Sequence, residues 1–212
     1  MASELATAMA DLDEAKVQGL VQAGLAQGVS PAQLLEECRE GMTLIGKRFE
    51  SGEYFLSDLI MAGEIFKAAA ARLTAQPGTV PAKPKGVVVM GTVKGDIHDI
   101  GKDIVVTMLR GAGYQVEDLG VDVPPERFVE AAKASGAGIV GLSGLLTTSF
   151  DPMKQTVEAL SAAGLRPAVK VIIGGGPVTE KVKEYVGADH LGHDAQEAVR
   201  LCDRWLGGNQ NG

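Results

Sequence analysis

Up to residue 76, the apolar residues recur at intervals of three and four, which is the spacing of amphipathic helices. Two short stripes come first, and their members are Leu5, Met9 and Leu12, then Val17, Leu20, Val21 and Leu25. A third helix is predicted to start at Ser30-Pro31, because serine is a good N-cap and proline suits the first helical position. It ends at Ser51-Gly52, and a fourth helix is predicted over 56–75. Four helices with short joints predict a small antiparallel bundle.

After residue 85, short apolar runs alternate with amphipathic stretches. The run Val87-Val88-Val89-Met90 is typical of a strand that is buried on both faces of a sheet. Strands are predicted over 85–93, 114–119, 138–142, 169–173 and 189–191, and helices over 102–111, 124–136, 150–163, 178–186 and 194–206. Five strand–helix units predict an α/β domain with a flavodoxin-like, doubly wound parallel five-stranded sheet, in the strand order 2-1-3-4-5.

Prolines at 77, 81 and 84, with Gly78, separate these two patterns. Such a run cannot continue a helix and is typical of a semi-extended connector. We therefore predict an all-α four-helix bundle cap domain at 1–76, a linker at 77–86 and a flavodoxin-like domain at 87–212.

The composition narrows the functional classes. The 212 residues carry a net charge of −7, so the basic surface of a nucleic-acid-binding protein is not expected. The N-terminus lacks the basic start and apolar run of a signal peptide, and no apolar stretch is long enough to span a membrane. Cys38 and Cys202 lie far apart, which does not suggest a disulfide framework. A cytoplasmic protein without membrane or nucleic-acid partners is predicted.

Three loops rich in Gly, Ser and Thr follow the first, third and fourth predicted strands. They are Gly91–Gly101, Ser143–Ser149 and Gly174–Pro177. In a doubly wound sheet these loops meet at the carboxyl ends of the strands, next to the point where the strand order reverses. Ligands bind at that point in this fold, and a ligand site is therefore predicted there.

The first of these loops holds Asp96 and His98 between Gly95 and Gly101. Side chains two residues apart leave an extended backbone on the same side. A carboxylate beside an imidazole selects one tautomer and leaves the other ring nitrogen free to act as a base or a metal ligand. A loop histidine next to a helix-capping aspartate is the alternative, and the pair alone does not decide between them.

Other familiar sites are poorly supported. His190 and His193 are the remaining histidines, and no cysteine cluster accompanies them as in a zinc site. The first loop lacks the Gly-x-Gly-x-x-Gly turn of nicotinamide-binding proteins. Ser143 lacks the Gly-x-Ser-x-Gly elbow of a hydrolase.

The three loops together resemble the cobalamin-binding domain shared by methionine synthase and by the corrinoid proteins of methyltransferase systems. The resemblance is carried by Asp96-x-His98-x-x-Gly101, then Ser143-x-Leu145, then Gly174-Gly175. The string from Met90 to Lys102, and Glu53-Tyr54-Phe55-Leu56 in the helical half, are similar to the small corrinoid proteins in particular. The sequence departs from the small corrinoid proteins at Ser57, where they commonly have proline. The resemblance covers nearly the whole chain.

This resemblance implies a corrinoid bound base-off/His-on, with His98 as the metal ligand below cobalt. It further implies that Asp96 bonds to His98, that Ser143 supports Asp96, and that the helical half covers the upper face of the cofactor with Phe55. His98, Asp96 and Ser143 would form the catalytic group. The cofactor-binding residues implied are Asp96, His98, Asp99, Ile100, Gly101, Ser143, Leu145, Thr147, Gly174 and Gly175. Thr148 and Ser149 are further residues that could reach the cofactor's tail.

The function implied by the resemblance is that of a methyl carrier. It would accept a methyl group on cobalt from a substrate methyltransferase and pass it to an acceptor methyltransferase that uses tetrahydrofolate or coenzyme M. A reductive activator would be a third partner. The chain has no room for a substrate barrel, so it is expected to be a subunit and not a complete enzyme. A cobalamin-binding sensor is the main alternative, and an adenosylcobalamin mutase subunit is a third.

Overall fold

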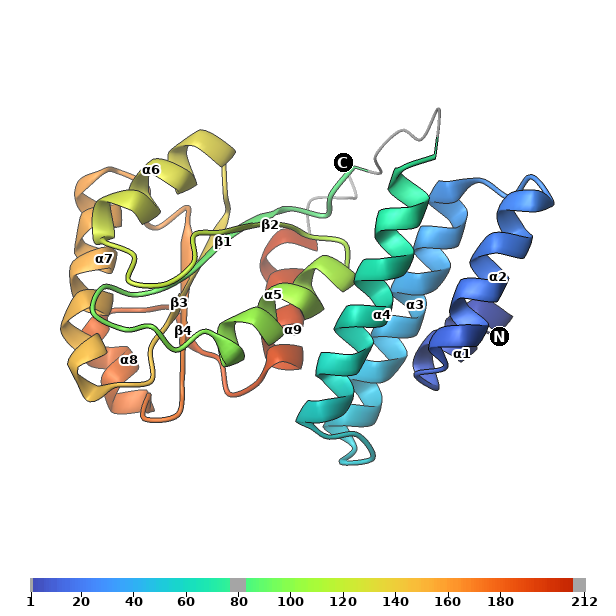
Figure 1. Ribbon diagram of the computed structural model, residues 1–212. Helices are drawn as coiled ribbons and strands as arrows, with labels where there is room; N and C mark the ends of the chain where they lie inside the picture. Colours follow the sequence, from blue (N-terminus) through green and yellow to red (C-terminus); the bar gives the residue numbers. More distant parts are fainter. Residues whose placement is uncertain (1, 77–82, 208–212) are drawn as a thin grey trace. The chain divides into compact units, whose positions relative to one another are not determined.

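The computed structural model describes residues 2–76 and 83–207 and divides the chain into two compact units (Figure 1). The first unit comprises the described residues up to Lys83, together with Gly111–Gly113. The second comprises Pro84–Arg110 and the described residues from Tyr114 onward. Residues 77–82 of the predicted linker lie outside the described residues. In the described ranges, no helix is both long enough and apolar enough to cross a membrane.

Four helices form the first unit, as predicted. They are α1 (Glu4–Ala10), α2 (Glu14–Ala26), α3 (Pro31–Glu50) and α4 (Leu56–Thr74). The predicted N-cap of the third helix is confirmed, because the Ser30 hydroxyl accepts a hydrogen bond from the Gln33 amide at 3.2 Å. Of the two short predicted stripes, Leu5, Met9, Val17 and Val21 are buried in the core, whereas Leu12, Leu20 and Leu25 are half-buried. The fully buried side chains of this core include Met9, Val17, Val21, Ile45, Leu59, Ala62, Ala69 and Leu73.

Five parallel strands form one sheet in the described part of the second unit. They are β1 (Val87–Thr92), β2 (Gln115–Asp118), β3 (Ile139–Ser143), β4 (Lys170–Gly174) and β5 (His190–Leu191). The order is β2-β1-β3-β4-β5, which confirms the predicted topology. Thr92 pairs with Ser143, and Ser143 pairs with Gly174, so the carboxyl ends of β1, β3 and β4 lie at the same edge. This register brings the three glycine-rich loops together.

Helices cover both faces of the sheet (Figure 1). One face carries α5 (Ile100–Gly111) and α9 (Ala195–Leu206), and the other carries α6 (Pro125–Ser135), α7 (Phe150–Ala162) and α8 (Glu180–Val186). A short 3-10 turn, η1 (Thr147–Ser149), precedes α7 and was not predicted. The fifth helix also starts two residues earlier than expected, at Ile100 in place of Lys102. Both differences fall in the loops at the predicted site.

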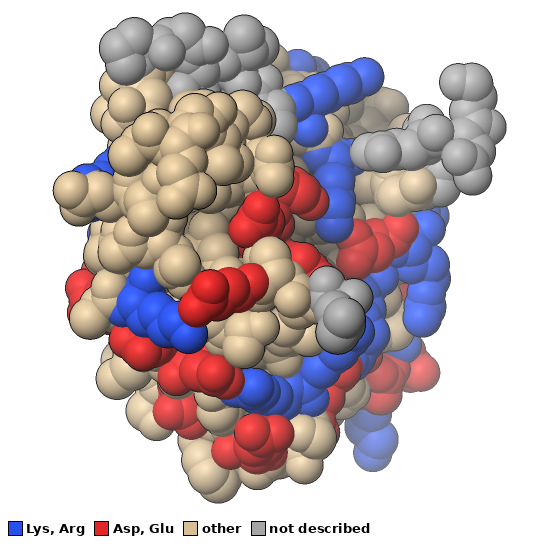
Figure 2. Space-filling model, turned by 90° about the vertical axis from the view of Figure 1, so that its right-hand side faces the viewer, with Lys and Arg blue, Asp and Glu red and all other residues tan. Residues whose placement is uncertain are grey.

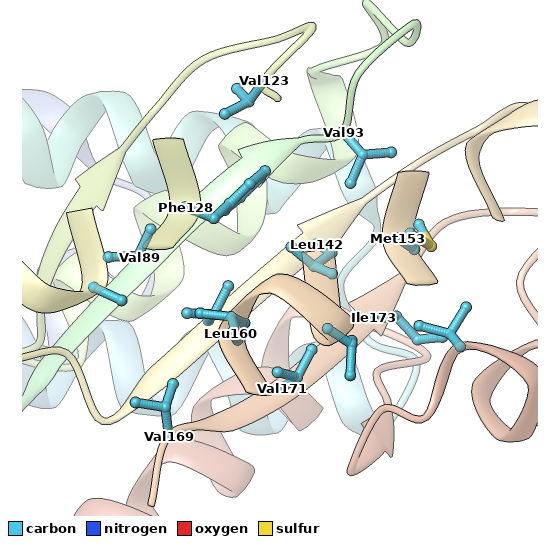
Figure 3. Close-up of a cluster of buried hydrophobic side chains, with 14 of the residues drawn as sticks. Val89, Val93, Val123, Phe128, Leu142, Met153, Leu160, Val169, Val171 and Ile173 are labelled. Carbon is cyan, nitrogen blue, oxygen red and sulfur yellow. The ribbon is translucent and has the colours of Figure 1, made fainter. Parts of the chain in front are cut away.

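The larger core of the second unit lies between the sheet and α6–α8 (Figure 3). Alternate strand residues, such as Val89, Leu142 and Ile173, pack there against Phe128 and Leu160 from the helices. Their neighbours in the strands, such as Val88 and Ile172, are buried on the opposite face. Burial of both faces explains why these strands are continuously apolar in sequence.

The two cysteines are both buried free thiols, as the absence of a cysteine pattern indicated. Burial raises the pKa of Cys38 and of Cys202 to about 12, so both are protonated at neutral pH. They therefore behave as small apolar core residues and not as nucleophiles.

Charged side chains of both signs lie on the surface of the protein. On the face shown in Figure 2, acidic and basic side chains are interspersed, with no large block of either sign.

Candidate functional site

The loop between β1 and α5 carries a buried carboxylate at the carboxyl edge of the sheet. Asp96 is fully buried, although its neighbours Lys94, Gly95, Ile97 and His98 are exposed. The Thr92 hydroxyl, at the end of β1, donates to the His98 carbonyl oxygen at 3.1 Å and so holds the far side of the loop. The chain therefore turns one charged group inward while the residues around it face outward.

Two separate sets of donors surround the Asp96 carboxylate. Its Oδ2 accepts hydrogen bonds from the Leu145 amide at 2.7 Å, the Leu146 amide at 3.1 Å and the Ser149 hydroxyl at 2.7 Å. Its Oδ1 accepts from the His98 amide at 3.0 Å and lies 2.7 Å from His98 Nδ1. Burial alone raises the pKa of Asp96, but the hydrogen bonds from Ser149 and His98 outweigh it and hold that pKa well below its usual range. Asp96 is therefore an anion in the folded protein.

The charge on Asp96 decides which tautomer His98 adopts. A carboxylate carries no proton, so at 2.7 Å the His98 Nδ1 must be the donor and Oδ1 the acceptor. The neutral ring then has its lone pair on Nε2, and no hydrogen bond links this atom to the described residues. The His98 side chain is 48% exposed. The loop thus presents one oriented imidazole nitrogen at the surface of the second unit.

The hydroxyl that supports Asp96 belongs to Ser149, whereas the resemblance implied Ser143 in this role. Ser143 is the last residue of β3, where its carbonyl accepts a hydrogen bond from the Val93 amide at 3.0 Å. The chain then passes through η1, and this turn brings Ser149 to the buried carboxylate. Both are serines of one loop, and their spacing in sequence does not show which of them the turn directs inward.

The glycines after β4 are explained by close contact between two loops. The Gly144 amide donates to the Gly174 carbonyl at 3.1 Å. Gly175 has a φ of 137°, and a Cβ at this position would lie 1.9 Å from the Gly144 carbonyl oxygen. Any side chain at 175 would push the third loop away from the second. Gly174 and Gly175 therefore keep the loop that supports Asp96 in place.

The side chains of the remaining predicted residues lie around this centre and make no hydrogen bond to Asp96 or His98, although the Leu145 backbone amide does bond to Asp96. The Asp99 carbonyl accepts from the Asp103 amide at 2.8 Å in the first turn of α5, and Gly101 lies in the same turn with open space where a Cβ would be. Thr147 and Thr148 are exposed in η1. Ile100 and Leu145 are exposed at the loop surfaces.

Large apolar side chains are exposed on these loops, and sequence reasoning identified only some of them. Ile97 is 72% and Ile100 68% exposed. Leu145, Leu146 and Val121 are exposed as well. Clusters of exposed apolar residues on a soluble protein mark binding surfaces. Ile97, Leu146 and Val121 were missed, and the signal that could have found them is an apolar residue within a loop that is otherwise small and polar.

Comparisons with known proteins show the family to which the chain belongs. Residues 86–200 match the B12-binding family, described as a B12 binding domain, and residues 1–74 match a second family of the same description. The dimethylamine corrinoid protein 2 of Methanosarcina mazei is 43% identical over 85% of both chains, and the dimethylamine corrinoid protein of Methanosarcina barkeri is 39% identical over 96% of both. This chain belongs to the B12-binding corrinoid proteins.

Solved structures of corrinoid proteins have the same fold. A cobalamin-binding protein from Desulfitobacterium hafniense is 45% identical, with a TM-score of 0.78, and the match covers 95% of this chain and 97% of that one. The methanol:cobalamin methyltransferase complex MtaBC from Methanosarcina barkeri contains a chain that is 29% identical, with a TM-score of 0.86, over 97% of this chain and 79% of that one. The corrinoid protein described here therefore binds cobalamin or a related corrinoid.

The residues present fit such a cofactor. The described residues contain no group of three or more His, Cys, Asp or Glu side chains that could hold a metal ion by themselves. A single imidazole nitrogen on an apolar surface suits a metal that brings its other ligands with it, as a metal in a macrocycle does. The apolar loop residues match the hydrocarbon edge of such a ring.

A buried lysine follows the corrinoid protein's histidine loop. Lys102 is 3% exposed, and its ammonium group lies 2.5 Å from Asp103 and 2.7 Å from Asp118, at the end of β2. Burial alone lowers the pKa of Lys102, but the hydrogen bonds to Asp103 and Asp118 outweigh it and leave that pKa raised. The lysine is charged, and its ion pairs join the start of α5 to β2.

Asp118→Ala is expected to lower the free energy of unfolding of the second unit by about 2–3 kcal/mol, because it removes the less exposed partner of a buried charge. Lys102→Met removes the charge itself and is expected to change this free energy by less than about 1 kcal/mol. Urea unfolding followed by the fluorescence of Trp205, the single tryptophan, reports on this unit. Asp103→Ala, at the exposed partner, is the control. Equal losses in all three variants would contradict the prediction.

The first unit carries an exposed apolar surface of its own. Phe55 and Leu56, at the start of α4, are 67% and 51% exposed, and Ile60 and Met61 follow on the next turn. The Arg48 guanidinium and the Tyr54 hydroxyl both donate to the Ala10 carbonyl, at 2.6 and 2.7 Å, which ties the turn before Phe55 to the end of α1. The role predicted for Phe55 above the cofactor stays a prediction.

Proposed function

We propose that this corrinoid protein carries methyl groups between methyltransferases, and that it binds its cofactor with His98 as the lower ligand of cobalt, in the base-off/His-on mode. The observation that carries the proposal is the hydrogen-bonded series Ser149–Asp96–His98, which leaves one imidazole nitrogen unpaired. When bound, the corrinoid supplies a cobalt centre that holds a methyl group between donor and acceptor. The similarity to dimethylamine corrinoid proteins and to the MtaBC complex supports this role.

The protein's own residues orient the ligand. Asp96 keeps the proton on His98 Nδ1, so that the lone pair of Nε2 faces away from the carboxylate. The Ser149 hydroxyl and the Leu145 and Leu146 amides keep Asp96 from moving or taking up that proton. A carboxylate that bonds to the non-coordinating nitrogen of a metal-bound histidine sets the basicity and direction of that histidine. We propose Asp99, Ile100, Gly101, Leu145, Thr147, Gly174 and Gly175 as further cofactor contacts.

The proposed partners are a substrate methyltransferase, an acceptor methyltransferase and a reductive activator. Tetrahydrofolate and coenzyme M are the candidate acceptors. Methylamines are the first donors to test, because several of the relatives are named as dimethylamine corrinoid proteins. The comparisons do not favour the alternative of a cobalamin-binding sensor.

Transfer of a labelled methyl group tests the proposal. The protein is loaded with hydroxocobalamin, reduced, and mixed with carbon-14 dimethylamine, methylamine or methanol and a candidate methyltransferase from the same organism. We expect label to remain with the protein-bound corrinoid and to leave on addition of an acceptor methyltransferase with its acceptor. Protein without corrinoid is the control. A loaded protein that takes up no label with any of these partners, but changes its assembly in light, would support a sensor.

A further inference from the structure

Asp122, in the loop between β2 and α6, has an unusual backbone conformation. Its φ is 53°, in the left-handed region that residues other than glycine rarely adopt. Among the described residues other than glycine, only Leu12 also has a positive φ. Such a conformation costs free energy and persists where surrounding contacts require it, often beside a functional site. Leu12 lies between two helices of the first unit, whereas Asp122 lies at the carboxyl edge of the sheet.

Asp122 makes two hydrogen bonds, and both go to the loop that carries His98. Its Oδ1 accepts from the Gly95 amide at 2.7 Å. Its own amide donates to the Asp96 carbonyl oxygen at 2.9 Å. One residue of the β2–α6 loop therefore holds two consecutive residues of the β1–α5 loop, and the second of these, Asp96, carries the carboxylate that bonds to His98.

The contacts around Asp122 place it at the end of a short parallel pairing. Val123 pairs with Val93, and its amide donates to the Thr92 carbonyl at 3.0 Å. Beyond this pairing the first loop turns sharply at Gly95, whose φ is 82°, and the Asp96 amide donates to the Val93 carbonyl at 3.1 Å. Asp122 bonds to both residues of this turn. It therefore holds the backbone at the point where the chain leaves the sheet.

The Asp96 carboxylate and the Asp96 backbone are held from different sides. The Leu145 and Leu146 amides and the Ser149 hydroxyl, from the loop after β3, hold the carboxylate. Asp122, from the loop after β2, holds the backbone. With both sets of contacts in place, the Asp96 side chain has little freedom to move. Because His98 bonds to this carboxylate, the direction of the imidazole is fixed as well.

We propose that Asp122 is a positioning residue for His98: it holds the Gly95–Asp96 turn so that the imidazole is presented in one direction before the corrinoid binds. The inference rests on the proposed role of His98 as cobalt ligand. The hydrogen bonds of Asp122 go to Gly95 and Asp96, not to His98, and its side chain is exposed, so replacing it creates no cavity.

Three substitutions separate the side chain of Asp122 from its backbone. Asp122→Asn keeps an acceptor and a residue that tolerates the left-handed region. Asp122→Gly keeps the backbone conformation but loses the acceptor. Asp122→Ala loses the acceptor and is strained at this φ. Glu126→Ala, in the first turn of α6, is the matched control, because it removes the same charge from a neighbouring exposed position.

The first readout uses the protein without cofactor. Hydrogen exchange at the Gly95 amide is expected to be faster by about tenfold in Asp122→Ala and Asp122→Gly, because the hydrogen bond to a carboxylate is lost. Asp122→Asn and Glu126→Ala should exchange as the wild type does. Trp205 fluorescence checks that the second unit is folded, and if Asp122→Ala does not fold, Asp122→Gly decides.

The second readout is the binding of cobalamin. Asp122→Ala and Asp122→Gly are expected to bind about tenfold more weakly and to show a mixture of nitrogen-coordinated and uncoordinated spectra, an effect of the size found for groups that orient a metal ligand. Wild-type exchange and spectra in both variants would overturn the inference. If His98→Ala itself leaves the spectrum unchanged, the proposed function fails instead. A shifted spectrum in His98→Ala, with no effect at Asp122, rejects only the positioning role.

Discussion

Replacing His98 with alanine is expected to abolish nitrogen coordination of the bound corrinoid by the protein and to weaken its binding by about 10- to 100-fold. The His98 imidazole is the proposed cobalt ligand, and Asp96 fixes its Nδ1 as the hydrogen-bond donor. Alanine leaves the apolar loop surface intact, so the corrinoid is expected to bind in a form without an axial histidine. Absorption spectra of the loaded variant would show this shift.

Isotope labelling identifies the nitrogen. The chain has only three histidines, so growth with nitrogen-15 histidine labels His98, His190 and His193 alone. In the cobalt(II) state, a histidine ligand should convert the superhyperfine pattern in the electron paramagnetic resonance spectrum from a triplet to a doublet. A cofactor benzimidazole, which stays unlabelled, would keep the triplet.

The control variants for His98 are His190→Ala and His193→Ala. His190 lies 3.3 Å from Glu197, and His193 is exposed beyond β5, so neither belongs to the loop of Asp96. Both variants should keep the doublet. In the His98→Gly variant the deleted ring leaves space, so added imidazole should restore nitrogen coordination of the bound corrinoid. A doublet that survives in His98→Ala would refute the proposed ligand.

Replacing Asp96 is expected to have the second large effect, on both stability and coordination. In Asp96→Ala, the Leu145 and Leu146 amides and the Ser149 hydroxyl lose their common acceptor in a buried position. Unpaired buried donors of this kind cost about 3 kcal/mol or more in the free energy of unfolding. Asp96→Asn does not repair the site, because each oxygen faces donors and an amide nitrogen would stand against one set.

The two serines of the second loop provide a matched comparison. Ser149→Ala removes one of the bonds to Asp96 and is expected to lower the free energy of unfolding by about 1–2 kcal/mol. Ser143→Ala should leave it nearly unchanged, because the structure shows no hydrogen bond from Ser143 to Asp96. Urea unfolding followed at Trp205 measures both. A larger loss of unfolding free energy in Ser143→Ala than in Ser149→Ala would show that Ser143 supports Asp96.

The pH dependence of stability gives an independent check on Asp96. Its pKa is lowered in the folded protein, so the unfolded state binds a proton more readily than the folded state does. The stabilisation is therefore complete above the usual aspartate pKa of about 3.9 and is lost as the pH falls below that value toward the folded pKa. In Asp96→Ala the stability should fall less steeply over this acid range. An unchanged slope would show that Asp96 is not held as an anion.

The architecture of this protein could be predicted from local patterns. Apolar spacing in the first 76 residues predicted the four helices, and the alternation of apolar runs and amphipathic stretches predicted the parallel sheet and its strand order. These predictions succeeded because helices and parallel strands bury side chains at regular intervals, and this regularity is present in the sequence itself. Strand order also determines which loops meet, and so the position of the site was predictable together with Asp96 and His98.

The other partners of those two residues were decided by tertiary structure alone. Ser149 takes the place expected of Ser143 because η1 turns the chain back toward Asp96, and no periodic pattern describes such a turn. Asp122 reaches Gly95 from 27 residues away in the sequence, and the neighbouring Asp96 as well, through a backbone conformation that its residue type does not require. Regular elements repeat one local geometry, whereas the hydrogen bonds between loops depend on where the whole sheet places each loop end.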